Sequence, residues 1–517
     1  MSHFLSSRLS FGLLSLLIAG LFYLPPIRNH TEAEDAFWYA RNVEVYSYSE
    51  VARPNHRLYH LVAKATYDLS GQDRSFPVLV AFSAFSSGAA LVLFYYLIKK
   101  FTVCSPIASL GWVACLAFSY GFWRYGREVE AYALGWLVSL TVLTCVFRSK
   151  EGWLRGILFA LMVVLALNFH RALGPPLAAT GLGYLLIKKQ WRSSIVSLAV
   201  GASLYLLSET FFQNVPQAAA EEREVVTSVQ AVNEGEALES QKRFGASSFS
   251  KALIGLGACV LGGNVVMSSD RIFDILQERV FRYRFLEEER MMAESASGLQ
   301  LWLWVLGGGA IVVLVAVAAK MVFERRSEFA HSIGSEGCSA LLGALCYAIM
   351  ILVFEPGNPE MWLLGLPFIF LSLVLLVGDF FKEKIWFMAM LLCGTNYLGG
   401  ISLLRDEKND YHFVTSELVR KEALEGDVYL VGRINMVHAR FVRYHSAARV
   451  IQVKDGLASG NLELISHQIS HGGRVFAHQS YCKLFENAEE FLEKNGFILL
   501  PSSEGQAGYE ILLFPQV

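Results

Sequence analysis

The chain is short of charged residues. Asp, Glu, Lys and Arg make up 17% of its 517 residues, whereas about a quarter is usual for a soluble domain. Hydrophobic residues reach 54%, and the mean hydropathy is +0.40. This deficit of charge, together with repeated apolar runs of roughly 20 residues, excludes an ordinary soluble protein. It indicates a chain that crosses a membrane many times.

Cysteine and cleavage signals are also scarce. All eight cysteines except Cys482 lie in or beside apolar runs, so no disulfide framework is expected in the polar C-terminal part. The apolar run from Phe11 to Leu24 ends in Pro25-Pro26 without a small-residue cleavage site, which indicates an uncleaved first span. The formal net charge of -2 is uninformative, and no nucleic-acid partner is expected.

Apolar segments predict a polytopic α-helical membrane protein of about 11 transmembrane helices. A membrane domain is expected over 1–405 and a small soluble α/β domain over 406–517, with a long first outer loop at 29–75. The apolar segments lie at about 9–27, 76–98, 103–121, 130–147, 153–170, 172–187, 193–213, 248–268, 298–322, 337–354, 359–380 and 385–404.

Basic residues in short loops predict the orientation, because such loops stay in the cytoplasm. The first loop, the 120–129 turn, the 355–360 turn and the C-terminal domain then lie on the non-cytoplasmic face. The parity of crossings requires that 248–268, which holds four glycines, does not span. We predict that it is re-entrant or interfacial; the alternative is that this loop breaks the charge rule. The basic residues are Lys99-Lys100, Arg148, Lys150, Arg155, Lys188-Lys189, Arg192, Arg325-Arg326, Lys382 and Lys384.

The C-terminal part alternates strand-like and helix-like stretches, which predicts a small layered α/β domain. No glycine-rich phosphate fingerprint follows its first strand, so no nucleotide site is expected. Strands are predicted at 427–432, 448–453, 474–478 and 509–514, and helices at 434–446 and 487–495.

The first outer loop carries the leading candidates for chemistry. Glu34 and Asp35 follow the first span, where a carboxylate could act as a general base or hold a metal ion. The alternative is a pair of solvated loop acids neutralised by Arg41 or Arg53.

The turn at 120–129 and the residues after it form a second group. Arg124, Arg127, Glu128 and Glu130 fall within seven residues at the start of a span. Ionisable residues entering a membrane helix are functional candidates, although arginine and glutamate also serve merely as end caps.

Three further places complete the same face. His170-Arg171 could bind a lipid phosphate or diphosphate, or form a tight turn that happens to be basic. Glu355 and Glu360 lie in a rigid turn rich in proline and glycine, whose acids could simply face water. The stretch 269–297 has apolar residues at helical spacing with interleaved arginines, among them Arg279 and Arg282, which predicts an interfacial amphipathic helix.

These motifs resemble the GT-C superfamily of integral-membrane glycosyltransferases, in its protein O-mannosyltransferase, aminoarabinose-transferase and DUF2723-like branch. GREVEAYAL after Phe122-Trp123 is similar to a second-loop motif of that branch. NFHRALGPPLAA is similar to its short His-containing turn, and EPGNPEMWLLGLP to a late-loop segment. The likeness in layout covers roughly residues 1–380. The first loop departs from the usual pattern with Glu-Ala-Glu-Asp-Ala-Phe, which leaves the base between Glu34 and Asp35.

The resemblance implies an inverting transfer from a polyprenyl-phosphate-linked sugar to a protein, lipid or glycan acceptor at the outer face of the bacterial plasma (inner) membrane. Asp35 would be the base, and His170, Arg171, Arg279 or Arg282 would face the departing phosphate. Glu128 or Glu130 would position sugar hydroxyls or Arg127. Some relatives use a divalent metal and others do not, so the resemblance assigns no cofactor.

Two other classes compete with this interpretation. A transporter or flippase of lipid-linked substrates would carry mid-span ionisable residues and paired helix breaks, and few charges fall mid-span here. A ligase or polymerase of lipid-linked glycans usually has its large outer loop late in the chain, whereas the acidic loop here is early.

Overall fold

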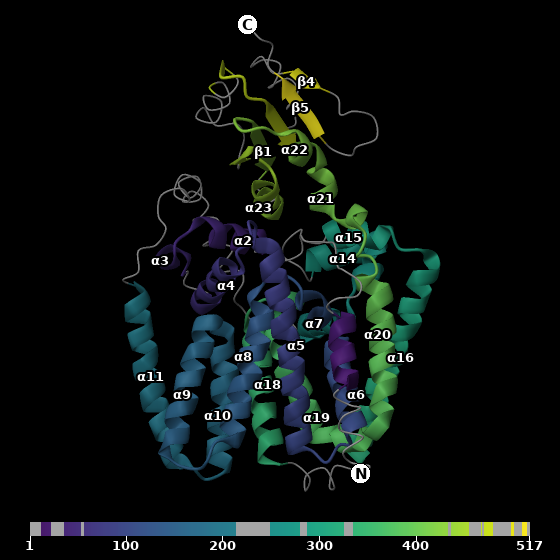
Figure 1. Cartoon of the computed structure of the whole chain (residues 1–517). Coiled ribbons are helices and arrows are strands. Elements are labelled where there is room, and N and C mark those ends of the chain that lie inside the picture. Colours follow the sequence, from purple (N-terminus) through teal and green to yellow (C-terminus); the bar gives the residue numbers. More distant parts are fainter. Residues whose placement is uncertain are drawn as a thin grey trace.

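The computed structural model describes a helical bundle capped at one end by a small sheet (Figure 1). Of the candidates, Glu34, Asp35 and Arg282 lie outside the described residues, as do the side chain of Arg279 and the predicted helix 487–495. The described residues are 12–21, 36–52, 56–213, 249–279, 287–324, 334–432, 436–453, 467, 470–478, 498–500 and 509–513.

The predicted membrane bundle is confirmed. Among the residues that the structure describes, six helices are long and apolar enough to cross a membrane, and shorter apolar helices pack beside them. The chain is therefore an integral membrane protein. The bundle comprises a helix at Gly12–Leu21, α5 (Ser75–Phe101), α6 (Pro106–Ala117), α8 (Ala131–Arg148), α9 (Trp153–Phe169), α10 (Gly174–Ile187), α11 (Trp191–Gln213), α16 (Gly298–Glu324), α18 (Ser335–Val353), α19 (Leu366–Phe381) and α20 (Ile385–Asn396).

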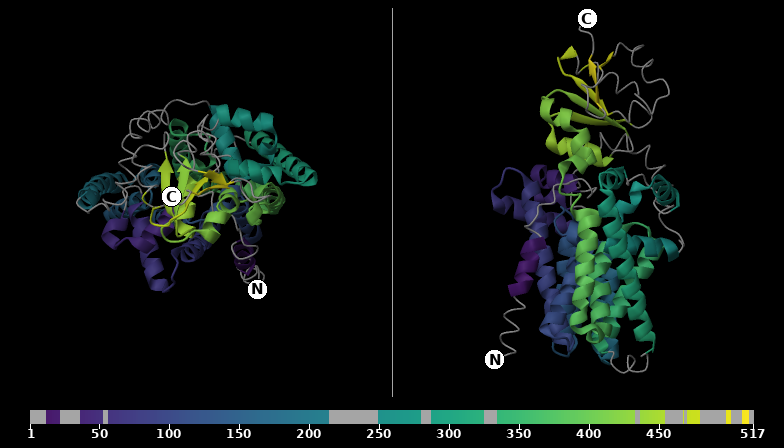
Figure 2. Two further views of the ribbon diagram at one scale, coloured as in Figure 1. Left: turned by 90° about the horizontal axis from the view of Figure 1, so that it is seen from above. Right: turned by 90° about the vertical axis from the view of Figure 1, so that its right-hand side faces the viewer.

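The basic loops meet at one end of this bundle. Ser105, before α6, donates to the Glu383 carboxylate between α19 and α20 at 2.7 Å. Lys188, after α10, pairs with Glu336 of α18 at 3.8 Å. Short helices occupy the opposite end, beneath the C-terminal sheet (Figures 1 and 2). They are α2 (Ala36–Val45), α3 (Tyr48–Val51), α4 (Arg57–Ser70), α7 (Tyr120–Tyr125), η1 (Arg171–Leu173) and η3 (Pro359–Gly365).

The segment predicted as re-entrant or interfacial forms a short helix, α13 (Phe249–Leu261). Its 13 residues span roughly 20 Å at 1.5 Å per residue, less than a bilayer core of about 30 Å. Gly262 ends it with a φ of +65°, a conformation that favours glycine. The 3-10 helix η2 (Asn264–Ser268) follows.

Contacts place α13 among the turns of the capped end. Asn396 donates to the Val260 carbonyl at 2.8 Å and to the Phe118 carbonyl at 2.6 Å. α11 ends, and α16 begins, at this same end of the bundle (Figure 1). A chain that leaves and returns at one end needs no net crossing between them. The geometry therefore agrees with a segment that does not span.

The stretch predicted as one amphipathic helix contains two described helices, α14 (Asp270–Arg279) and α15 (Glu287–Glu294). Phe273 of α14 is buried with Ala293 of α15. Arg290 joins the two helices through Asp270, at 2.5 Å between nitrogen and oxygen. Both helices lie at the capped end (Figure 1).

The predicted α/β domain is confirmed as a sheet of five described strands in the order β2-β1-β3-β5-β4. β1 pairs in parallel with β2 and β3, whereas β5 is antiparallel to β3 and β4. The prediction missed β4, because three residues are too few for a recognisable alternation. The elements are α21 (Tyr411–Thr415), α22 (Glu417–Glu422), β1 (Val428–Gly432), α23 (Met436–His445), β2 (Arg449–Val453), β3 (Val475–His478), β4 (Ile498–Leu500) and β5 (Tyr509–Leu513).

A reporter inserted at Gln230, between α11 and α13, tests the path of the chain. We expect it on the same side of the membrane as a reporter in the α2–α4 region, because both flanking helices end there. Accessibility of each reporter to a membrane-impermeant reagent in intact cells measures this. A reporter at Gln230 on the opposite side would make 248–268 a true span.

Replacement of Gly255 tests how α13 docks. A Cβ there would lie 2.2 Å from the Pro356 carbonyl oxygen, a backbone atom that cannot simply rotate away. Gly255→Ala should lower stability by roughly 1–3 kcal/mol, measured as thermal unfolding of the detergent-solubilised protein. Gly257→Ala is the matched control, because nothing lies within 4 Å of a Cβ there. Equal melting temperatures of the two variants would contradict this packing.

Candidate active site

Ring contacts and one hydrogen bond bring four of the predicted polar segments together at the capped end. The ring centroids of His56, before α4, and His170, after α9, are 4.5 Å apart. Tyr132, in the first turn of α8, lies 6.0 Å from His170 and donates from its hydroxyl to the Glu360 carboxylate at 2.7 Å. The first loop, the start of α8, the His170 turn and the 355–360 turn therefore meet as predicted.

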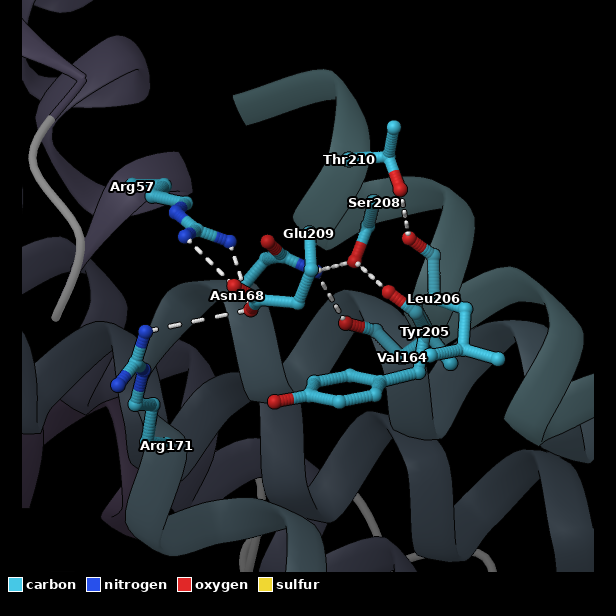
Figure 3. A network of polar contacts seen from close by, with 9 residues as sticks. All are labelled: Arg57, Val164, Asn168, Arg171, Tyr205, Leu206, Ser208, Glu209 and Thr210. Atoms are coloured by element: carbon cyan, nitrogen blue, oxygen red, sulfur yellow. Dashed lines mark hydrogen bonds and ion pairs between the residues drawn. The ribbon is translucent and has the colours of Figure 1, made fainter. Parts of the chain in front are cut away.

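An ion pair joins the same loop to the end of α11 (Figure 3). Arg57 of α4 donates from both terminal nitrogens to the two oxygens of Glu209, at 2.8 and 3.0 Å. The Arg57 side chain is only 6% exposed. Arg171 approaches the same carboxylate from η1 at 3.9 Å, and its side chain is 53% exposed. Two guanidinium groups thus share one carboxylate, which leaves the group with a net positive charge.

His170 complements these cations as a neutral donor. Burial and the neighbouring His56 hold the pKa of His170 well below its usual value, so the ring is uncharged at neutral pH. Its Nδ1 accepts a hydrogen bond from the Ala172 backbone nitrogen at 3.2 Å. In a neutral imidazole the proton then resides on Nε2, which makes Nε2 a hydrogen-bond donor.

The candidate residues between 120 and 130 lie in different surroundings. Arg124 is 2% exposed and donates to Glu128 at 3.0 Å and to the Tyr120 hydroxyl at 2.8 Å. Asn264 of η2 donates to that same hydroxyl at 2.8 Å. This pair therefore lies toward η2, and the Tyr120 hydroxyl joins the turn to that segment.

Arg127 and Glu130 lie on either side of Glu128 in the same connection. Arg127 is half-buried, whereas Glu130 is buried and precedes α8 as its N-cap residue. The carboxylate of Glu130 accepts from the Ala131 backbone nitrogen at 3.3 Å. Glu130 therefore caps α8, the helix that carries Tyr132.

The 355–360 turn is held in an unusual backbone conformation. Glu355 has a φ of +45°, in the left-handed region that residues other than glycine rarely adopt. Pro356 follows, and a proline restricts its preceding residue further. Trp362 donates to the Pro356 carbonyl at 2.9 Å, which fixes the turn. Such strain concentrates at functional sites. Here the conformation of Glu355 sets the direction of the backbone that leads to Glu360.

Sequence reasoning did not single out several residues of this site. Glu209 carried a usable signal, because it is an acid near the end of an otherwise apolar run, where ionisable residues usually have a partner and a function. His56, Arg57 and His60 stood in the dense first loop, but spacing alone could not tell them from solvated neighbours. Tyr132 lies within the GREVEAYAL motif and was missed as a polar contributor.

Within the described ranges, no group of three or more His, Cys, Asp and Glu side chains is arranged to hold a metal ion. Glu34 and Asp35 fall outside those ranges, so the described residues assign no metal.

Comparison with known proteins returned structures but no sequence families. No family model matches the chain, and no curated protein does. ArnT from Cupriavidus metallidurans bound to undecaprenyl phosphate is similar with a TM-score of 0.46 and 10% identity, over 98% of this chain and 97% of ArnT. Its apo form gives a TM-score of 0.47.

The archaeal oligosaccharyltransferase AglB from Archaeoglobus fulgidus, in complex with an inhibitory peptide and a dolichol-phosphate, is similar with a TM-score of 0.48. The identity is 11%, over 92% of this chain and 70% of AglB. At these scores and identities the likeness assigns neither a family nor an activity to the chain.

Arg57 and Arg171 give a matched test of the ion pair, because both face Glu209. Arg57→Gln should destabilise the protein by more than about 1 kcal/mol, since it removes two hydrogen bonds to a partly buried carboxylate. Arg171→Gln should cost no more than about 1 kcal/mol, because that pair is long and exposed. Thermal unfolding in detergent compares them, and equal losses would contradict the assigned burial.

Proposed function

We propose that the chain is a membrane glycosyltransferase. It moves a sugar from a polyprenyl-phosphate-linked donor to an acceptor hydroxyl or amide at the non-cytoplasmic face. The observation that carries this proposal is the cationic group of Arg57, Arg171 and Glu209 beside His170, set at the mouth of a membrane bundle. A lipid-linked phosphate reaches such a place from the bilayer and needs donors there.

Arg171 is the group best suited to the donor phosphate. Its guanidinium is half exposed and lies 3.9 Å from Glu209, so an anion can approach without displacing the closer Arg57 pair. A guanidinium binds phosphate oxygens in a two-pronged geometry. The Nε2–H of His170 supplies a neutral donor nearby. Arg279 and Arg282 are proposed as further cations on the phosphate.

The acceptor side is assigned to the first-loop acids. Asp35, with Glu34 as the alternative, takes the proton of the acceptor hydroxyl or amide as that atom attacks the anomeric carbon. The bond from this carbon to the phosphate oxygen breaks, and its electron pair leaves with the phosphate. Cationic donors stabilise the charge that develops there. Attack from the side opposite the phosphate inverts the anomeric centre.

Acids on the neighbouring turns are proposed to hold the sugar. Carboxylates accept hydrogen bonds from sugar hydroxyls, and Glu360 and Glu130 flank Tyr132 in the site. Glu128, Glu355, Arg124 and Arg127 are proposed as further contributors. A divalent metal is neither required by these steps nor assigned by the described residues.

A transporter or flippase is the competing proposal. The observation in its favour is Glu209, an ionisable residue within an apolar helix, as expected along a substrate pathway. Glu209 lies near the end of α11, however, and its partners Arg57 and Arg171 belong to the capped end rather than to a path through the bundle. A ligase or polymerase of lipid-linked glycans would use the same cations.

Replacement of Asp35 tests the proposal. In cells that carry Asp35→Asn or lack the protein, a glycosylated polyprenyl phosphate should accumulate, because its consumption requires the base. Mass spectrometry of membrane lipids measures the pool, and the sugar mass identifies the donor. Asp68→Asn is the matched control, because Asp68 is a half-exposed acid of the same loop paired with Lys64 at 3.2 Å.

Three outcomes separate the interpretations. Accumulation with Asp35→Asn and in the deletion, but not with Asp68→Asn, supports a transferase that uses Asp35. Accumulation in the deletion alone would retain the transferase and move the base to Glu34. An unchanged lipid pool in a well-expressed Asp35→Asn variant and in the deletion would remove the transferase assignment and favour transport.

A further inference from the structure

The C-terminal domain shares a buried core with the helix that directly follows Glu34 and Asp35. α2 begins at Ala36, and both Ala36 and Phe37 are buried. The Phe37 ring stacks on Phe76 of α5 with centroids 4.7 Å apart. It meets Phe441 of α23 edge-on at 4.9 Å. The second residue after the proposed base is therefore enclosed between the membrane bundle and the C-terminal domain.

The other end of α2 is held by a polar node. One oxygen of the Glu44 carboxylate accepts from the Ser75 backbone nitrogen at 2.7 Å and from the Tyr444 hydroxyl at 2.9 Å. Ser75 is the first residue of α5, so the carboxylate lies at a helix N-terminus, where the helix dipole favours an anion. One carboxylate thus connects α2 to α5 and to α23.

The hydroxyl, the ring and the backbone carbonyl of Tyr444 all take part in this polar node. Its hydroxyl donates to Glu44 and accepts from the Phe76 backbone nitrogen at 3.1 Å. The Arg74 guanidinium lies 4.1 Å from the centre of the Tyr444 ring and donates to the Tyr444 carbonyl. The residue is 6% exposed, and loss of its hydroxyl removes the hydrogen bonds to Glu44 and to the Phe76 backbone nitrogen.

We propose that α23 is a positioning element for the reaction. Through Tyr444 and Phe441, the C-terminal domain fixes both ends of α2, the helix that begins directly after Glu34 and Asp35 in the sequence. This inference rests on the proposed function, because it assigns the base to that segment. Domains joined by polar interfaces normally move relative to each other, whereas an apolar core and a three-helix node hold them as one body.

The physical reason is the sensitivity of group transfer to geometry. A displacement of about 1 Å at a reacting group can cost a hundredfold in rate. α2 has only ten residues, too short to be stable alone, so its orientation depends on what it packs against. α5 provides one side of that packing and α23 provides the other.

Tyr444→Phe and Glu44→Ala test the proposal in the full-length protein in detergent. Hydrogen–deuterium exchange should rise about tenfold over residues 36–45, because a hydrogen bond to a carboxylate is lost. Exchange over β1 should stay unchanged, since the sheet itself is intact. Glu44→Gln should stay near the wild type, because its amide oxygen still accepts from Ser75 and Tyr444.

The same variants are expressed in cells that lack the protein and have accumulated the donor lipid. Tyr444→Phe and Glu44→Ala should consume that lipid about tenfold more slowly per molecule of protein, and Glu44→Gln should consume it at nearly the normal rate. Tyr184→Phe is the control. Tyr184 lies near the basic end of α10 and interacts with Glu336, so the same chemical change there should leave both readouts unchanged.

Unchanged exchange over 36–45 in Tyr444→Phe would overturn the proposal, as would normal lipid consumption despite faster exchange. Faster exchange over β1 as well would show a role in folding rather than positioning. Failure of the proposed function is distinguishable from these results, because no donor lipid would then accumulate in the deletion or with Asp35→Asn.

Discussion

A partly buried ion pair between the first loop and the end of α11 is the interaction on which the site depends. Arg57 is almost fully enclosed and bonds both oxygens of Glu209. A guanidinium in that position is tolerable only with a partner, because an isolated buried charge costs several kcal/mol. The pair therefore fixes α4 against α11. It also places His56, the residue before Arg57, against His170, which follows α9.

Small residues allow the turns at this end to approach one another. A Cβ on Gly121 would lie 2.5 Å from Leu363 and 2.9 Å from the Cys259 sulfur. A Cβ on Gly400 would lie 2.2 Å from the Tyr120 ring. α7, α13 and η3 can therefore pack in direct contact, and the polar groups they carry are drawn into one region. The glycines in and between the apolar helices therefore allow these close contacts.

Much of the fold could be predicted from sequence because bilayer thickness and loop charge are strong, local signals. The apolar spans followed from such signals, and the four longer strands followed from short strand-like stretches in the C-terminal part. That 248–268 does not span stays a prediction, which rests on the parity of crossings and on the glycines of that segment. The pairing of Arg57 with Glu209 could not be foreseen, because 152 residues separate them and no periodicity links a loop cation to a distant helix. The same limit hid Tyr132 and its bond to Glu360, although both lay in recognised motifs.

The C-terminal domain shows that a boundary drawn from composition does not tell whether the two parts share a core. The change from apolar to polar sequence near residue 405 suggests an appended module, yet its helix α23 completes a core begun by α2 and α5. Phe37, Phe441 and Tyr444 are each less than 7% exposed, and the Phe37 ring contacts both of the others. The burial of apolar surface on both sides makes separation costly. The first loop, the bundle mouth and the sheet are consequently one structural unit.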